Sequence, residues 1–295
     1  MTITKLQPKG LTISLIIEVE SANYGEGIGN VSSLKKISRG NSEQYSYISR
    51  QALRYNITEQ MGINATPIEP HKNVLQFHPD ATIKNHPEID LFGYMKTGGN
   101  TKISRAAVVR LSNAIALESY NTDLEFLTNK GLLDRYNLTA KEPLKGGNIA
   151  QSEIHKSFYT YTVTIDLEHI GVDEELEIPL EERATRVIAL LKTLKFLYRD
   201  IKGRRENLSP LFIIGGIYNF KNPFFENRLK LQDLNLLVEP IQGVLALDEE
   251  IKKETKIGMV KGIFTNDIEL QEKLQPLSII EVFKHLEAEI KNYYK

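Results

Sequence analysis

Two segments of the chain, 11–20 and 158–167, alternate between apolar and polar side chains over ten residues each. Successive side chains of a β-strand point to opposite faces, so this alternation predicts two strands that each bury one face. The apolar positions of the first are Leu11, Ile13, Leu15, Ile17 and Val19. Those of the second are Tyr159, Tyr161, Val163, Ile165 and Leu167. We therefore expect a core built on a sheet, with the first strand half-buried.

Helical signals separate these strands. Residues 46–61 are predicted to form a helix, with Ser46 as the candidate cap and Gly62 just past its end. A second helix opens at Pro179, and its apolar face consists of Leu180, Ala184, Val187, Leu191, Leu194 and Tyr198. Further strands are expected at 103–111 and 211–217. The order strand, helix, strand, strand, helix, strand is typical of a ferredoxin-like fold, which predicts an α+β fold class.

Three polar stretches interrupt this core. Residues 63–102 are rich in Pro, His and Asn, which indicates a large insertion. Residues 120–153 are predicted to form a second excursion from the core, and residues 219–235 a third, basic one. Short strands are expected at 241–247 and 257–264, and Ser278 is expected to cap a last amphipathic helix.

Charge is unevenly distributed along the 295 residues. Lys and Arg total 37 against 38 Asp and Glu, so the whole chain carries no nucleic-acid signature. Residues 34–54, however, hold five basic residues and one acidic, and 192–230 hold nine and three. Residues 239–289 reverse the balance, with eleven acidic and six basic. A chain with this charge distribution can present a positive groove and remain soluble. The acidic block of one copy can also contact the basic block of the next copy, head to tail.

The chain has no cysteine, which excludes disulfides, thiolate catalysis and cysteine-ligated zinc. A reducing cytoplasm is the expected setting. The first ten residues lack the apolar core of a signal peptide, and no apolar run approaches the roughly 18 to 20 residues that span a bilayer. We expect a soluble, cytoplasmic protein without a membrane partner.

The most informative stretch for function runs from Gly25 to Met61. It holds a glycine-rich loop at 25–30, then a basic segment, then a helix on which Arg50 and Arg54 stand four residues apart. That spacing puts both guanidinium groups on one helical face, at about the separation of successive phosphates. Two planar donor groups in a row suit a nucleic-acid backbone, although a solvated helix face is the alternative.

Two motifs in this sequence resemble those of a known family. The first has the form G-N-x-x-x-L-K-K followed by S-x-x-A-L-R, here Gly29, Asn30, Leu34, Lys35, Lys36, Ser49, Ala52, Leu53 and Arg54. The second is D-L-F-G at 90–93. Both resemble the Cas seven (DevR) family, the repeated backbone subunit of Cascade, the RNA-guided CRISPR surveillance complex, in its type I-B branch. The match covers the first third of the chain well and the rest by order of elements.

The resemblance implies a single modified ferredoxin-like (RRM-like) palm over 1–295, with a finger at 63–102 and a thumb at 219–235 or, in competition, at 120–153. It implies a non-catalytic subunit that polymerises along CRISPR guide RNA in a helical row, beside other Cascade subunits, and presents the guide for pairing with target DNA. The candidate RNA-binding residues are Asn23, Asn30, Lys35, Lys36, Arg39, Ser49, Arg50, Arg54, Arg204, Arg205 and Lys221. For Arg204 and Arg205, a helix C-terminus that favours cations is the alternative explanation.

Other kinds of site are not supported by their spacing. The glycine loop lacks the Gly-Lys-Ser/Thr end of a phosphate-binding Walker loop and the third glycine of a dinucleotide fingerprint, which leaves a flexible turn or a backbone approach to RNA. The histidines His71, His78 and His86 match no zinc pattern, so we expect no metal and no cofactor. Ser152 and His155 form no recognisable nucleophile and base pair.

Aromatic residues on the second alternating strand are candidates for base stacking or for the core. Phe158, Tyr159 and Tyr161 occupy the strand where an RNA-recognition motif stacks bases, yet the consensus of that motif is absent. We therefore expect them to be core residues.

Two alternative functions remain open at this stage. Backbone subunits of type III effectors cut RNA with an aspartate in the loop after the first strand, whereas Glu26 is the one acidic residue between Ser21 and Gly40 here. We expect Glu26 to be a solvated loop residue. A stand-alone single-strand RNA-binding protein or developmental regulator is the second alternative.

Overall fold

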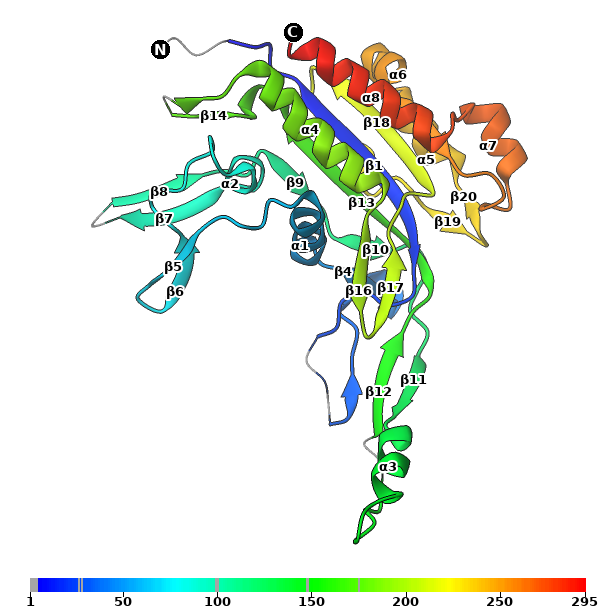
Figure 1. Ribbon diagram of the computed structural model, residues 1–295. Coiled ribbons are helices and arrows are strands. Elements are labelled where there is room, and N and C mark those ends of the chain that lie inside the picture. Colours follow the sequence, from blue (N-terminus) through cyan, green and yellow to red (C-terminus); the bar gives the residue numbers. More distant parts are fainter. Residues whose placement is uncertain (1–4, 26, 28, 99–100, 147–148, 175) are drawn as a thin grey trace.

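A computed structural model describes residues 5–25, 27, 29–98, 101–146, 149–174 and 176–295 of the chain. Its centre is an antiparallel sheet with the order β21-β18-β1-β13-β10-β4-β3, in which β9 also pairs with β13 (Figure 1). The strands of this sheet are β1 (Gly10–Val19), β3 (Lys36–Ser38), β4 (Gln44–Ile48), β9 (Val109–Leu111), β10 (Ala114–Ala116), β13 (Ser157–Asp166), β18 (Phe212–Tyr218) and β21 (Lys256–Met259).

The ferredoxin-like order expected from the sequence is present in this sheet. Helix α1 (Arg50–Met61) follows β1, and α4 (Leu180–Lys195) follows β13. The central strands lie in the order β18-β1-β13-β10, so the first and third core strands are adjacent and antiparallel. The predicted α+β fold class is confirmed.

Each face of the sheet carries its own hydrophobic core. The first face packs against α1, α4 and α8 (Ile279–Tyr293) through residues such as Leu15, Tyr161 and Leu191. The second face packs against α5 (Val238–Leu245), α6 (Glu249–Glu254) and α7 (Asp267–Leu274) through residues such as Ile16 and Phe212. Figure 1 shows the two helical layers on opposite sides of β1 and β18.

The second layer overturns the expectation of a half-buried first strand. Thr12 and Ser14 are fully buried, and the Ser14 and Thr162 hydroxyl oxygens lie 2.6 Å apart in a hydrogen bond. Ser14 and Thr162 therefore satisfy each other beneath the C-terminal helices instead of meeting water, whereas Thr12 Oγ1 has no hydrogen-bond partner among the described residues. The expectation that Tyr159 and Tyr161 are core residues is confirmed, since both are buried.

The stretch 63–105 is more regular than its composition suggested. It contains the hairpin β5 (Ile68–His71) and β6 (Val74–Phe77), the helix α2 (Pro87–Phe92), and the hairpin β7 (Tyr94–Gly98) and β8 (Thr101–Arg105). In Figure 1 this insertion, in cyan, extends to one side of α1.

The other two excursions differ from each other. The strands β11 (Asp123–Thr128) and β12 (Ile149–Ile154), with α3 (Lys130–Asn137) between them, project away from the sheet as an arm (Figure 1). Strand β12 also pairs in parallel with β2 (Val31–Ser32). In contrast, 219–235 lies against the second core, where Phe225 and Leu229 are buried, and its β19 (Leu231–Gln232) pairs with β20 (Asn235–Leu236).

Two further hairpins flank α4: β14 (Val172–Asp173) with β15 (Leu176–Glu177), and β16 (Tyr198–Ile201) with β17 (Arg204–Asn207). Tyr198 thus begins a strand and does not continue the helix, which ends at Lys195. Short 3-10 turns occupy Gly40–Ser42 and Leu167–His169. Among the described helices, none is both long and apolar enough to cross a membrane.

Besides the end of α4, three boundaries and one element type were predicted wrongly. The strand expected at 103–111 is divided between β8, which ends at Arg105, and β9. Residues 44–48 form β4, so the helix starts at Arg50 and Ser46 is no cap; its hydroxyl instead bonds His155 Nδ1 and the Tyr159 hydroxyl inside the core. Residues 241–247 are mostly helix, because Val238, Ile241 and Val244 recur every third residue and face the core together. The strand expected at 257–264 stops at Met259, before a turn at Gly262.

Candidate nucleic-acid interface

Helix α1 carries the two arginines that the sequence places on one helical face. It begins at Arg50 because Ser49 caps it: Ser49 Oγ accepts a hydrogen bond from Ala52 N at 3.3 Å. It ends at Gly62, whose left-handed conformation closes the last turn. The Ser49 side chain, a predicted RNA contact, therefore has a structural role within the helix.

Arg50 and Arg54 of α1 and Arg110 of β9 all line one cavity of about 330 Å³. The remaining lining residues are Gln51, Phe92, Ala107, Val109 and Leu111. We call this hollow the arginine cavity. Each guanidinium presents a planar set of donors that fits a carboxylate or phosphate, so three of them around one hollow form a site for an anionic group.

The three guanidinium groups differ in how they are neutralised. Arg50 is exposed and has no ion pair within the described part of the chain. Arg54 Nη2 lies 3.8 Å from Glu88 Oε1 and its guanidinium covers the Phe92 ring, and burial lowers the Arg54 pKa from its ordinary value. Arg110 Nη1 contacts Asp166 Oδ2 at 2.8 Å, yet half of its side chain is exposed. The cavity therefore keeps a net positive charge.

A second, smaller cavity of about 220 Å³ continues along the same segment. Leu111 lines the arginine cavity, and the next two residues, Ser112 and Asn113, line the second one. Asn113 Oδ1 accepts a hydrogen bond from Arg50 N at 2.9 Å, which ties this segment to the start of α1. The basic residues of the second cavity are Arg39, whose guanidinium lies over the Tyr45 ring at 4.7 Å, and Lys230.

The basic segment before α1 is held at the base of the arm. Lys36 Nζ lies 2.6 Å from Glu153 Oε2 and 4.2 Å from the centre of the Tyr120 ring, so an acidic residue of β12 already neutralises it. The Lys35 backbone bridges Asn23 O and Tyr47 N. Its own side chain has no ion pair among the described residues.

The two asparagines predicted as RNA contacts are placed differently. Asn23 is partly buried, and its Oδ1 is a buried acceptor without a hydrogen-bond donor among the described residues. Asn30 is exposed, and its carbonyl accepts a hydrogen bond from Gln151 N at 2.9 Å. Asn30 therefore lies where the loop after β1 meets the arm, whereas the Asn23 backbone bonds Lys35 and Tyr47. Glu26 lies outside the described residues.

The basic turn after α4 is the β16–β17 hairpin. Arg204 contacts Glu20 and Glu206, and Arg205 makes two hydrogen bonds to Asp200, at 2.8 and 2.9 Å, over the Tyr198 ring. The hydrogen bonds to Asp200 raise the pKa of Arg205. Both predicted arginines are thus on the surface but paired with carboxylates.

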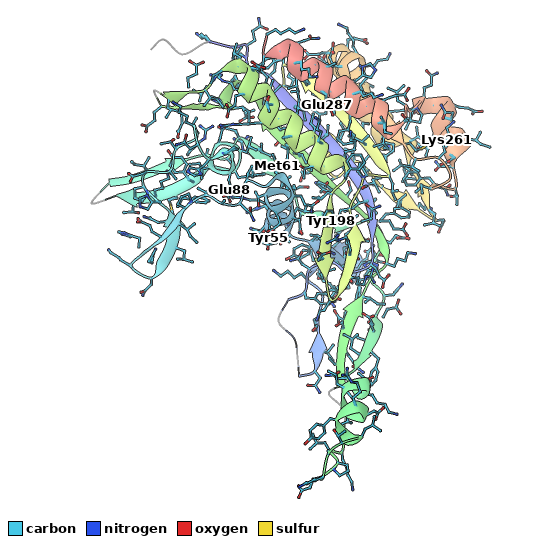
Figure 2. All side chains as sticks on the ribbon, viewed as in Figure 1. Tyr55, Met61, Glu88, Tyr198, Lys261 and Glu287 are labelled. Atoms are coloured by element: carbon cyan, nitrogen blue, oxygen red, sulfur yellow. The ribbon has the colours of Figure 1, made fainter. Side chains whose placement is uncertain are left out.

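Helix α1 connects the insertion to this hairpin. On one side Arg54 faces Glu88 of α2, and on the other Gln60 Oε1 accepts a hydrogen bond from Tyr198 N at 3.3 Å. Figure 2 shows Glu88 and Tyr198 on the two sides of the helix that carries Tyr55 and Met61. Helix α1 therefore lies between the insertion, which contacts Arg54, and the hairpin, which contacts Gln60.

Lys221 is not brought together with the other predicted residues. It pairs with Glu168, near the Gly10 end of β1, whereas Asn23 follows the other end of that strand. Ten residues of β-strand separate the two ends, a length of roughly 30 Å.

Sequence reasoning missed three residues of this surface. Arg110 completes the arginine cavity, and Tyr55 exposes 64% of its surface on α1. Lys202, at the tip of the hairpin, donates to Ser32 Oγ at 3.0 Å and lies over the Tyr24 ring at 4.6 Å. For Arg110 and Lys202, the only signal in the sequence was that each is a basic residue near other basic residues. The residues that they contact are distant in the sequence.

The described residues of the histidine-rich insertion form no cluster with the donors of a metal site. His78 lies 3.7 Å from both Glu69 and Asp80, but no group of three or more His, Asp or Glu residues in the described part of the chain is placed to hold a metal ion.

Comparisons with known proteins complete this description. A chain of a "CRISPR RNA-guided surveillance complex, pre-nicking" has a TM-score of 0.59 at 11% sequence identity, over 86% of this chain and 93% of that chain. A chain of a second "CRISPR RNA-guided surveillance complex" has a TM-score of 0.52 at 14% identity, over 86% and 90%. These likenesses concern the fold. No curated protein matches the sequence. The family model described as "CRISPR-associated negative auto-regulator DevR/Csa2" matches residues 11–233, and the chain belongs to this family.

Proposed function

We propose that the chain is a backbone subunit of a type I-B Cascade complex, which binds CRISPR guide RNA and presents it for pairing with target DNA. The arginine cavity is the observation that carries this proposal, because Arg50, Arg54 and Arg110 line one hollow. Similar folds occur in chains of RNA-guided surveillance complexes, and family membership agrees with the assignment. The type I-B branch rests on the two sequence motifs.

In this proposal the protein recognises the phosphate and ribose groups of the guide RNA. A guide strand must keep its base edges free for pairing, so specificity comes from the guide and the protein holds its backbone. The arginine cavity takes a phosphate group, and the second cavity with Arg39 and Lys230 continues the path. Lys202 of the hairpin, which has no ion pair among the described residues, adds positive charge on the other side of α1.

We assign the arm as the thumb and the insertion 63–105 as the finger. The arm exposes many large apolar side chains: Leu124, Phe126, Leu127, Leu132, Tyr136, Leu138, Leu144 and Ile149. Apolar surface gathered on one projecting element marks a contact with another molecule. Its occupant in this proposal is the next copy of the subunit, in a head-to-tail contact that propagates along the guide.

In this proposal the subunit catalyses no reaction and only holds the guide RNA in an ordered conformation. Support comes from the loop after β1, where Glu26 is the one acidic residue between Ser21 and Gly40. A single carboxylate on a glycine-flanked loop is poorly preorganised for cutting RNA. Assembled complex incubated with complementary RNA and magnesium or manganese should leave that RNA intact. Regularly spaced cleavage that Glu26→Gln abolishes would support a type III-like endonuclease instead.

Co-expression with guides of different lengths tests the backbone role. The expected product is an RNA-bearing oligomer whose mass, measured by light scattering after size exclusion, grows stepwise with guide length. RNA-free monomers, or closed two-fold dimers in electron micrographs, would contradict the proposal. RNA-bearing monomers at every length would favour a stand-alone RNA-binding protein.

A further inference from the structure

Helix α2 has two faces with different tasks. Its residues Glu88 and Phe92 are four positions apart and therefore share one face. Asp90 lies between them, about 200° around the helix from Glu88, and so faces the other way. The D-L-F-G motif at 90–93 spans the end of this helix.

The first face of α2 contacts Arg54. Glu88 Oε1 is 3.8 Å from Arg54 Nη2, and the centre of the Phe92 ring is 5.0 Å from the guanidinium carbon. Phe92 also lines the arginine cavity. The position of α2 therefore fixes one wall of the cavity and the surroundings of one of its three cations.

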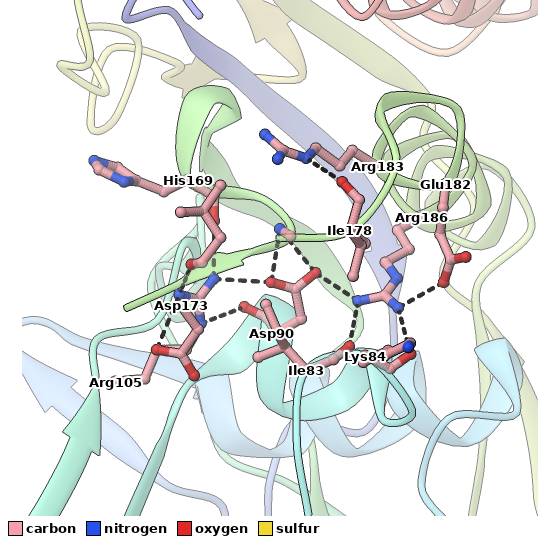
Figure 3. A network of polar contacts seen from close by, with 12 residues as sticks. Ile83, Lys84, Asp90, Arg105, His169, Asp173, Ile178, Glu182, Arg183 and Arg186 are labelled. Atoms are coloured by element: carbon pink, nitrogen blue, oxygen red, sulfur yellow. Dashed lines mark hydrogen bonds and ion pairs between the residues drawn. The ribbon is translucent and has the colours of Figure 1, made fainter. Parts of the chain in front are cut away.

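The second face of α2 is anchored by Asp90, which is fully buried. Its carboxylate accepts hydrogen bonds from Arg105 Nη2 at 2.8 Å, from Arg186 Nη1 at 2.8 Å and from Gly171 N at 2.9 Å (Figure 3). Arg105 ends β8, Arg186 belongs to α4, and Gly171 follows β13. One carboxylate thus joins the insertion to two parts of the palm.

This network is closely balanced in charge. The Arg105 and Arg186 side chains are only 8% and 4% exposed, and their other carboxylates, Asp173 and Glu182, lie nearer the solvent. Without the charge of Asp90, two buried guanidinium groups would lose their shared partner, which strongly disfavours the present arrangement. The remaining hydrogen bonds of Arg186, to Ile83 O and Lys84 O, do not involve α2 itself.

The rest of the motif supports the same placement. Leu91 is fully buried, and its carbonyl accepts a hydrogen bond from Val108 N at 3.1 Å. Gly93 has φ of 70°, and a Cβ there would lie 2.5 Å from Arg105 O. The end of α2 therefore packs directly on the backbone that leads into β9 and Arg110.

We propose that Asp90 is a positioning residue for RNA binding: it locks α2 onto the palm so that Glu88 and Phe92 hold the Arg54 guanidinium in the arginine cavity. This inference rests on the proposed function. It assigns Asp90 no contact with RNA; its effect passes through Arg54.

Binding of a single-stranded RNA to the full chain, measured against salt concentration, tests this role. Arg54→Ala should weaken binding by about tenfold and reduce the salt slope by about 0.7, the value for one lost phosphate contact. Asp90→Asn should produce a similar change. Because both changes act through one guanidinium, the double variant should lose little more than either single variant.

A matched control separates positioning from general destabilisation. Leu270→Ala removes a buried side chain of α7 in the second core, far from α2 in the chain, and should lower stability while leaving the salt slope unchanged. If Asp90→Asn does not fold, Arg105→Lys, which retains the charge but loses the forked donors, should lower the slope in the same direction.

The outcomes distinguish the two proposals. An unchanged slope for Arg54→Ala would overturn the arginine cavity as an RNA site, and with it the proposed function. A lowered slope for Arg54→Ala with a wild-type slope for Asp90→Asn or Arg105→Lys, or additive losses in the double variant, would overturn the positioning role alone.

Discussion

At the scale of single residues, carboxylates determine which basic side chains are free to bind an anion. The basic segment before α1 was visible in the sequence, but Glu153, which neutralises Lys36, lies 117 positions away. Glu168 pairs with Lys221 in the same way, 53 positions away, whereas Asp200 and Arg205 pair locally within one hairpin. The sequence therefore predicts where positive charge accumulates, whereas its availability depends on tertiary pairing that no local pattern reveals.

The buried pair between Arg199 and Glu206 gives a stability prediction. Glu206 accepts hydrogen bonds from Arg199 Nε and Nη2, at 2.9 and 2.7 Å, and from Ser21 N at 2.8 Å. Glu206→Gln would leave a buried guanidinium without its counter-charge, so we expect a loss of about 3–5 kcal/mol in the free energy of unfolding. Urea denaturation measures it. Asp200→Asn, which breaks an exposed pair in the same hairpin, should cause no measurable loss, and equal effects would contradict this account.

His155 gives a prediction for pH dependence. Burial lowers the pKa of its imidazole below the ordinary 6.5, against the opposing effect of Glu118. The unfolded chain therefore takes up a proton near pH 6.5, before the folded one does, so stability falls as the pH drops from 6.5 towards the lower native pKa. Between pH 7.5 and 5.5, His155→Gln should lose less unfolding free energy in urea than the wild type. Equal losses would show that His155 does not contribute to acid sensitivity.

At the scale of elements, local sequence patterns correctly predicted helix features that depend only on neighbouring residues. The S-x-x-A-L-R motif and Gly62 placed the body and end of α1, and the capping box of Ser278 and Glu281 starts α8 as expected. The start of α1 was predicted wrongly because serine is a residue type that commonly caps helices. The side chains that hydrogen-bond the Ser46 hydroxyl, His155 and Tyr159, are more than 100 residues away in the sequence. The D-L-F-G motif was recognised, but the partners of Asp90 were not predictable.

The arm permits a test of its role as an element. Phe126 and Gln151 are direct partners in β11 and β12, so Asn-Gly in place of residues 127–150 closes a two-residue hairpin. This change keeps Glu153 against Lys36 and removes mostly exposed side chains. We expect little change in thermal midpoint and normal binding of short RNA, but no growth of oligomers along long guides. Unaltered growth would refute the arm as the assembly contact.

A substitution elsewhere on the surface controls for the loss of apolar area. Ile268 of α7 exposes 78% of its surface, outside the arm. Ile268→Ser should leave oligomer growth as in the wild type, measured by light scattering on the same guides.

At the scale of the whole molecule, the ferredoxin-like order followed from patterns within each element, since its strands and helices carry clear periods of two and 3.6. The layer formed by α5, α6 and α7 could not be predicted in this way, because the sequences of short helices with mixed composition resemble those of strands and loops. That layer is why β1 is buried on both faces and why 219–235 lies flat on the second core. The projecting part of the molecule is instead the arm, which the sequence left as the competitor for the thumb.

The central claim is that the arginine cavity binds the backbone of a guide RNA without reading its bases. The most direct measurement is the affinity of wild type and of Arg50→Ala with Arg54→Ala for two unrelated guide sequences, across a range of salt concentrations. We expect the double substitution to weaken both complexes equally and to lower the salt slope by roughly one to two, as two phosphate contacts are lost. A loss confined to one sequence, or an unchanged salt slope, would contradict the account.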